Sequence, residues 1–95
     1  MTAAEGGERH QDHLVAGPGG VMTEEVGSVT GDLTVVTSVF PGNQVWVAVQ
    51  YRGADEWYTL TGTPAPLPDG CSLAEYHEHV LAAIRAGGEA VAPNL

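Results

Sequence analysis

Two runs of β-branched and aromatic residues on either side of a turn signal constrain the fold of this chain more than any other feature. The runs cover residues 33–40 and 44–51, and Pro41, Gly42 and Asn43 stand between them. Side chains of this kind favour strands, and Gly and Asn tolerate the positive φ that a tight turn requires. The sequence therefore predicts a β-hairpin with a short loop.

The length of that loop decides which side chains face the core, because a shift of one residue turns a strand over. A three-residue loop puts Val39 opposite Val45, whereas a two-residue loop brings Val36 and Phe40 to the core face. We prefer the three-residue loop, because its core face is more uniformly apolar. That face then consists of Leu33, Val35, Thr37 and Val39 on the first strand and Val45, Val47, Val49 and Tyr51 on the second.

The chain after the hairpin indicates a further strand and then a connector. Residues 56–61 predict a third strand of an antiparallel meander, with Tyr58 and Leu60 on the core face. Residues 62–70 hold three prolines at every second position, so we expect an extended segment that joins no ladder. Residues 21–30 are β-branched but interrupted by Gly27, which leaves open whether they add a fourth strand.

A helix is expected to follow this connector. Ser72 and Glu75 have the spacing of a capping box, and Gly87-Gly88 supplies a stop. The apolar residues between these ends recur at helical spacing, so one stripe should cover the core face of the hairpin. The stripe consists of Leu73, Tyr76, Val80 and Ile84. The predicted class is α+β, a three- or four-stranded antiparallel meander with one C-terminal helix packed on one face (β-β-β-α).

The 95 residues suffice for one domain. We expect a flexible leader over residues 1–20, a single α+β domain over residues 21–88 and a flexible tail over residues 89–95. The leader is rich in glycine and poor in large apolar side chains, and the tail follows Gly87-Gly88 and contains Pro93, which disfavours stable packing of both.

Charge narrows the classes of partner. Asp and Glu number 12 against 3 for Lys and Arg together, and the formal net charge is −9. Nucleic acids and anionic membrane surfaces bind clustered cations, so neither is an expected partner. The chain has one Cys, which cannot form an internal disulfide, and we therefore expect a cytoplasmic protein.

Few residues favour catalysis or metal binding, and no cofactor motif is present. Cys71 precedes the predicted helix and His77 lies near the centre of its apolar stripe, so the two are candidates for a reactive or ligand-contacting site. A packed histidine with one hydrogen-bonded ring nitrogen is the commoner arrangement. His10 and His13, with Asp12, have a spacing compatible with a metal, but in a flexible leader any affinity would be incidental. We predict no metal site.

The face of the sheet opposite the helix is the stronger functional candidate. Alternation puts Phe40, Trp46 and Trp57 there, and exposed aromatic side chains of this size are typical of interfaces. The face could be covered by the chain's own residues 21–30, by a second copy in a homodimer or by another protein. We therefore expect a small acidic, non-enzymatic interaction module of accessory or inhibitor type. The alternative is a small enzyme or ligand-binding domain that uses Cys71 and His77.

Overall fold

The central hairpin of the molecule is the one that the sequence predicts. In a computed structural model that describes residues 8–95, strand β4 spans Asp32–Phe40 and strand β5 spans Gln44–Tyr51. They pair antiparallel with Val39 opposite Val45, as a three-residue loop requires. The last two loop residues have positive φ angles of 85° and 57°, which Gly and Asn adopt readily. The predicted register is therefore confirmed.

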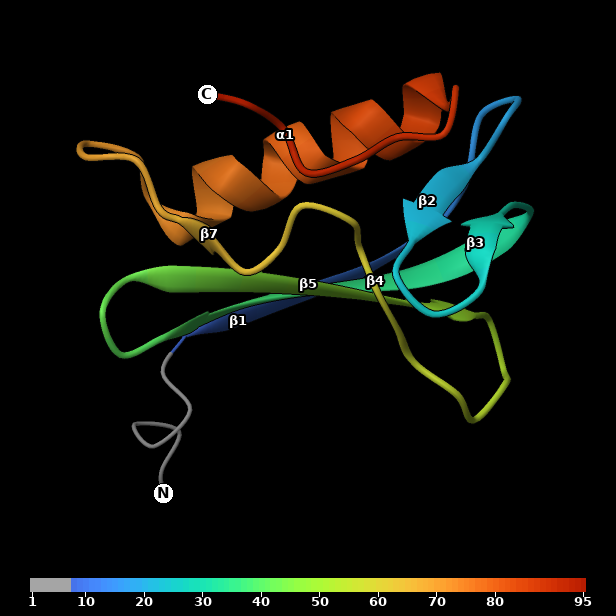
Figure 1. Cartoon of the computed structure of the whole chain (residues 1–95), viewed down its shortest axis with the longest axis horizontal. Helices are drawn as coiled ribbons and strands as arrows, with labels where there is room; N and C mark the ends of the chain where they lie inside the picture. The colour runs from blue at the N-terminus through green and yellow to red at the C-terminus, as the bar shows by residue number, and fades with distance from the viewer. Residues whose placement is uncertain (1–7) are drawn as a thin grey trace.

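Strand β1, Arg9–Val15, pairs with the other side of β4 and forms one edge of the sheet (Figure 1). This strand corrects the prediction of a flexible leader over residues 1–20, of which residues 1–7 lie outside the described residues. The segment is poor in apolar side chains, which is why its pattern does not indicate a strand. An edge strand needs few of them, because only one of its faces contacts the core.

Two short strands complete the sheet on the far side of β5. Strand β6, Tyr58–Thr59, pairs with the second half of β5, and strand β7, Ala65–Pro66, pairs with its beginning. The third strand is therefore shorter than the predicted 56–61. The proline-rich connector does join the ladder, contrary to expectation. It does so because the residues beside its prolines keep their N–H groups, and that of Leu67 donates to the Asn43 carbonyl at 2.8 Å.

A separate two-stranded sheet closes one end of the core. Strand β2, Val21–Thr23, and strand β3, Gly27–Val29, form a short hairpin. The side chains of Val21 and Val29 are buried among those of β4, β5 and the helix. Residues 21–30 thus do form strands, and these strands lie on the helix side of the main sheet.

Helix α1, Leu73–Ala86, begins at the predicted capping box. The Glu75 N–H donates to Ser72 Oγ at 3.0 Å, and the Ser72 N–H donates to the Glu75 carboxylate at 2.9 Å. The helix ends at Gly87, whose φ of 77° suits glycine. Within residues 8–95, no helix is long and apolar enough to cross a membrane.

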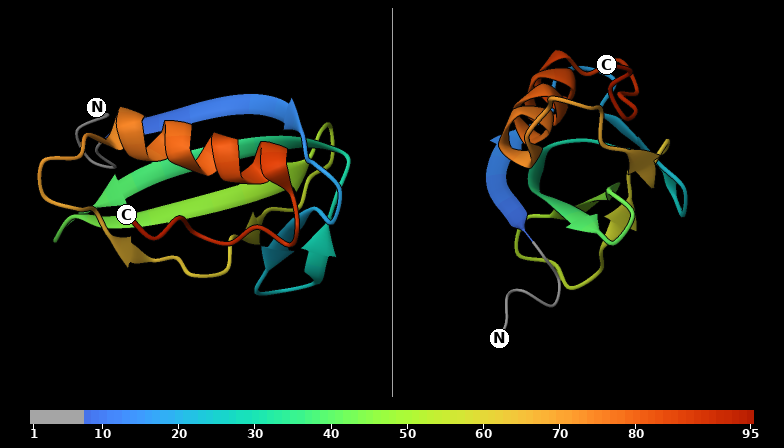
Figure 2. Two further views of the ribbon diagram at one scale, coloured as in Figure 1. Left: turned by 90° about the horizontal axis from the view of Figure 1, so that it is seen from above. Right: turned by 90° about the vertical axis from the view of Figure 1, so that its left-hand side faces the viewer.

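The buried stripe of α1 packs along β1 and β4, on the face that carries the alternating valines of β5 (Figure 2). Tyr58 and Leu60 also contact this core, as predicted. The buried helix residues are Leu73, Tyr76, His77, Val80, Leu81 and Ile84. The protein is therefore an α+β domain, an antiparallel sheet with one C-terminal helix on one face, which confirms the predicted class.

The turn after β1 is joined to the segment after α1 by main-chain hydrogen bonds. The bonds run from Gly17 N–H to Ile84 O, from Gly88 N–H to Pro18 O, from Glu89 N–H to Gly19 O and from Ala90 N–H to Gly20 O. Ala90 is buried and bridges to β2. The prediction of a flexible tail over residues 89–95 is therefore corrected for its first residues, which the turn at residues 17–20 holds in place. Local composition does not indicate a contact between segments so far apart in sequence.

Candidate functional site

The sheet face that points away from α1, here called the outer face, carries the predicted aromatic residues. Across three neighbouring strands, Arg9, Ser38 and Trp46 lie side by side, and Gln11, Val36 and Ala48 form the next row. The outer face consists of Arg9, Gln11, His13 and Val15 on β1, Asp32, Thr34, Val36, Ser38 and Phe40 on β4, Gln44, Trp46, Ala48 and Gln50 on β5, and Trp57 and Thr59 at β6.

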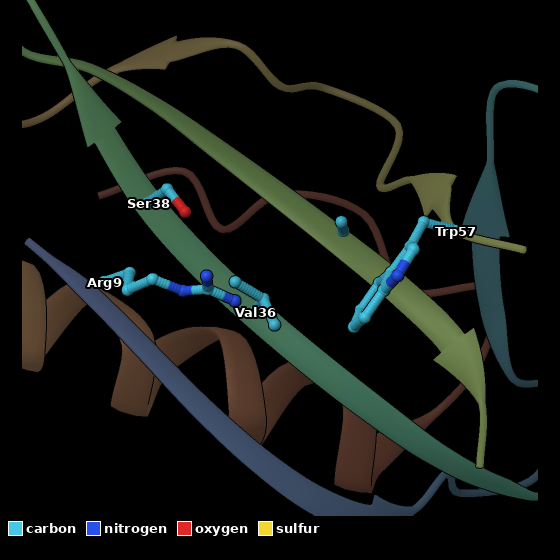
Figure 3. Close-up of a pocket in the computed structure, with 5 residues that line it drawn as sticks. Arg9, Val36, Ser38 and Trp57 are labelled. Carbon is cyan, nitrogen blue, oxygen red and sulfur yellow. The ribbon is translucent and has the colours of Figure 1, made fainter. Parts of the chain in front are cut away.

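Small side chains in the middle of this face leave a shallow depression of about 210 Å³. Val36, Ser38 and Ala48 line its floor, while Arg9 and Trp57 rise on opposite sides. Figure 3 shows the Trp57 indole lying over β5 and the Arg9 side chain reaching over β4. The depression is smaller than the clefts of about 300–1,000 Å³ that commonly hold small molecules. Its size suits one inserted side chain better than a metabolite.

The aromatic side chains of the outer face are only partly covered within the described chain. Phe40, Trp46 and Trp57 are 44%, 42% and 43% exposed. The suggestion that residues 21–30 lie over the tryptophans is therefore wrong, because the Val21 and Val29 side chains of that segment are buried on the helix side of the sheet. These two valines belong to the core between the sheet and α1.

Charge is unevenly distributed around the outer face. Asp32, at the start of β4, is the one carboxylate among the residues of the outer face. Its Oδ2 lies 3.6 Å from Nη1 of Arg52. At the β6 edge, Glu25 accepts hydrogen bonds from the Thr59 N–H and hydroxyl, both at 2.7 Å. The bonds from Thr59 hold the pKa of the Glu25 carboxyl below its usual value. The face thus carries aromatic, small and uncharged polar side chains on its central strands, with Arg9 on the edge strand β1 and carboxylates at the rim.

His77 is in the core, between the helix and the sheet. It is 2% exposed, its Nδ1 lies 2.7 Å from Thr37 Oγ1, and its Nε2 lies 2.8 Å from a carboxylate oxygen of Asp12. The His10 ring stacks on it at a centroid distance of 5.6 Å. Although a hydroxyl, an imidazole and a carboxylate stand in line, the Thr37 side chain is fully buried. A substrate cannot reach that hydroxyl, so the arrangement serves packing and hydrogen bonding.

The structure does not bring Cys71 and His77 together as a reactive pair. The Cys71 sulfur donates to the Ser72 carbonyl at 3.4 Å, while both ring nitrogens of His77 have the partners named above. A second depression of about 230 Å³ lies between the proline-rich connector, Tyr76 and residues 93–95. The Tyr76 hydroxyl is buried without a hydrogen-bond partner among the described residues, and burial raises its pKa. This depression also falls below the usual size of a small-molecule cleft.

The histidines of β1 point to opposite faces of the sheet, because they are three residues apart on one strand. His13 Nδ1 lies 2.8 Å from Thr34 Oγ1 on the outer face, and His10 Nε2 lies 2.8 Å from Glu8 on the other side. The two rings therefore cannot share an ion. No group of three or more potential ligands that could hold a metal occurs in the part of the chain that is described.

Two residues of these sites could not be predicted from the sequence. Arg9 joins the outer face and Asp12 joins His77 only because β1 pairs with β4. Residues 9–13 are all polar, so their sequence shows no alternation of apolar and polar side chains and resembles a loop. Arg9 and Asp12 are assigned to opposite faces only once the strand itself is known.

The fold and the outer face define a small α+β domain with an open, aromatic sheet surface. No protein-family model, no curated protein and no solved structure matches this chain.

Proposed function

We propose that this chain is a non-enzymatic protein-interaction module, of accessory or inhibitor type, that binds a partner protein on its outer face. The observation that carries the proposal is the exposure of Phe40, Trp46 and Trp57, between 42% and 44% each, on one face of the sheet. Trp, Tyr and Arg are enriched among the residues that dominate binding energy at protein interfaces. Trp offers a large contact area at a small entropic cost, because its side chain has only two rotatable bonds.

The charges and the depression specify the chemistry of that partner. The floor of small side chains accepts one apolar or aromatic side chain, and the Trp57 indole supplies a wall for it. Arg9 on the opposite wall has no ion-pair partner among residues 8–95, so a carboxylate on the partner would complement it. Asp32 and Glu25 at the rim repel further acidic groups. The expected partner surface is apolar, with a carboxylate near its centre.

The alternative function, an enzyme or ligand-binding domain using Cys71 and His77, has no contact between the two residues to support it. A cytoplasmic location remains part of the proposal and is supported by the single cysteine.

The test compares capture of partners by the wild type and by a Trp46→Ala/Trp57→Ala variant, followed by calorimetry on the purified partner. Tyr51→Ala is the matched control, because Tyr51 is 42% exposed and occupies a core-face position of β5. We expect the tryptophan variant to weaken binding at least tenfold, as for a residue worth about 1.4 kcal/mol or more. The control should bind like the wild type. A captured partner that binds the tryptophan variant with unchanged affinity refutes the proposal.

A further inference from the structure

Strand β1 has an open edge, and the hydrogen bonds at its two ends show which groups lie along it. The Val39 N–H donates to the Glu8 carbonyl at 3.2 Å, and the Ala16 N–H donates to the Gly31 carbonyl at 2.9 Å. Bonded and non-bonded pairs alternate in an antiparallel ladder. The even-numbered residues of β1 therefore bind β4, and the N–H and C=O groups of Arg9, Gln11, His13 and Val15 point away from the sheet.

These four residues are exposed, and no hydrogen bond outside the β1–β4 ladder reaches their main-chain groups within residues 8–95. Helix α1 packs on the core face of the sheet, and β1 is the outermost strand beyond it (Figure 2). An unpaired strand of seven residues is a template for another strand.

We propose that two copies of this chain pair through β1, antiparallel about a twofold axis at Gln11, so that the two sheets become continuous. The proposal is independent of the partner-binding role of the outer face. The partner is a second copy of this chain, because His10 and Asp12 on the core side of the strand complement each other in one register.

The direction in which the free N–H and C=O groups of β1 point restricts the register in which two β1 strands can pair. Odd-numbered residues must pair with odd-numbered residues, so the axis can pass through His10, Gln11, Asp12 or His13. An axis at Asp12 sets two carboxylates face to face, and one at His10 sets Glu8 against Asp12 of the second copy. Like charges directly opposite each other are destabilising.

The axis at Gln11 instead opposes an imidazole and a carboxylate on the core side, where His10 lies opposite Asp12 of the second copy. On the outer side it sets Gln11 opposite its own counterpart and Arg9 opposite His13. An axis at His13 opposes two histidines and leaves Asp12 against Leu14. Polar and inward-pointing charged groups usually protect an edge from indiscriminate pairing. On this strand they leave one complementary register.

The net charge of −9 on each chain opposes association, but β1 itself is close to balanced. It holds one arginine, one aspartate and two histidines. Charges elsewhere on the two copies are screened beyond about 8–10 Å at physiological ionic strength. The edge is therefore the part of the molecule where self-pairing costs little in repulsion.

Cysteine cross-linking tests both the pairing and its register, in a Cys71→Ser background. A bonded antiparallel pair has its Cα atoms about 5.5 Å apart, within the range of a disulfide. We expect Gln11→Cys to form a disulfide-linked dimer on mild oxidation, while Arg9→Cys and His13→Cys, on the same strand and face, stay monomeric. A cross-link through His13→Cys with none through Gln11→Cys refutes the register. The proposal is also wrong if none of the three positions cross-links.

A second variant tests the main-chain bonds. Gln11→Pro removes an N–H that β4 does not use, so the fold should survive, whereas the pairing loses donors at its centre. Light scattering over a concentration series should show a dimer for the wild type and for Gln11→Thr, and a monomer for Gln11→Pro. A wild type that stays monomeric up to about 1 mM overturns the proposal. So does a dimer that persists in Gln11→Pro and is lost in Trp46→Ala/Trp57→Ala, which would mean association through the outer face.

Discussion

Two threonines of β4 allow a comparison of the stability lost when a hydrogen bond to a buried histidine and one to an exposed histidine are removed. Thr37 Oγ1 lies 2.7 Å from Nδ1 of the buried His77, and Thr34 Oγ1 lies 2.8 Å from Nδ1 of the exposed His13. Both threonine side chains are buried. Thr37→Val and Thr34→Val therefore delete the same group, on the same strand, from the same kind of bond. They differ in whether the released histidine nitrogen can reach water.

The expected magnitudes follow from that difference. After Thr37→Val, Nδ1 of His77 has no partner and no access to solvent, which costs about 1–3 kcal/mol. After Thr34→Val, His13 is hydrated, so the loss is limited to the net value of an ordinary hydrogen bond, about 0.5–1.5 kcal/mol, offset by the added methyl group. We expect Thr37→Val to be the more destabilising by about 1 kcal/mol, the difference between the midpoints of the two ranges. Replacing both partners, as in Thr37→Val/His77→Leu, should recover part of the loss.

Urea denaturation gives the free energies of unfolding, and thermal melting provides a check. A loss of 1 kcal/mol lowers Tm by roughly 4–8 °C in a domain of 60–100 residues. Equal costs for the two threonine variants would refute the reasoning, because burial of the histidine would then carry no penalty. A double variant less stable than Thr37→Val alone would show that the contacts of His77 with Asp12 and His10 outweigh the cost of its unpaired Nδ1.

Three further predictions concern the helix cap, a close contact and a carboxylate. Ser72→Ala removes the side-chain acceptor of the capping box and should cost about 1 kcal/mol in urea denaturation, with Ser72→Thr close to the wild type. A Cβ at Gly17 would lie 2.2 Å from the Arg85 carbonyl oxygen, so Gly17→Ala should destabilise by about 1–3 kcal/mol or more in the same assay; a neutral result would mean that this turn yields easily. The pKa of Glu25 is lowered from 4.5 by its bonds to Thr59, so these bonds stabilise the fold above that pH and their contribution is lost as the pH falls through the lowered value. The wild type should therefore exceed Glu25→Gln in stability near pH 7 and lose this advantage on acidification, whereas an advantage that is constant with pH would contradict the assignment.

The hairpin and the helix could be predicted because their signals are local. The turn between β4 and β5 needs residues that adopt positive φ, and the helix start needs a cap, so each is specified by a few neighbouring residues. Strand β1 could not be predicted in this way. Its core face carries His10 and Asp12, and these polar groups become acceptable only through His77 on α1.

Some residues of the outer face could be predicted from local sequence and others could not. Alternation along β5 and its neighbours suffices to place Phe40, Trp46 and Trp57 on one side. The wall that Arg9 contributes depends on a strand with no apolar pattern of its own. The position of residues 21–30 depends on which surface offers more burial, and this comparison requires the packed helix.

The main-chain bonds between residues 17–20 and residues 84–90 set an order on the formation of this fold during synthesis. Strand β1 emerges from the ribosome before β4, β5 and α1, but the turn that ends it is secured only after the helix has been made. The Asp12 carboxylate likewise lacks its His77 partner until then. Contacts between such distant segments slow folding, because the intervening chain must be ordered first. The nascent chain therefore presents the apolar core face of the β4–β5 hairpin before helix α1 covers it.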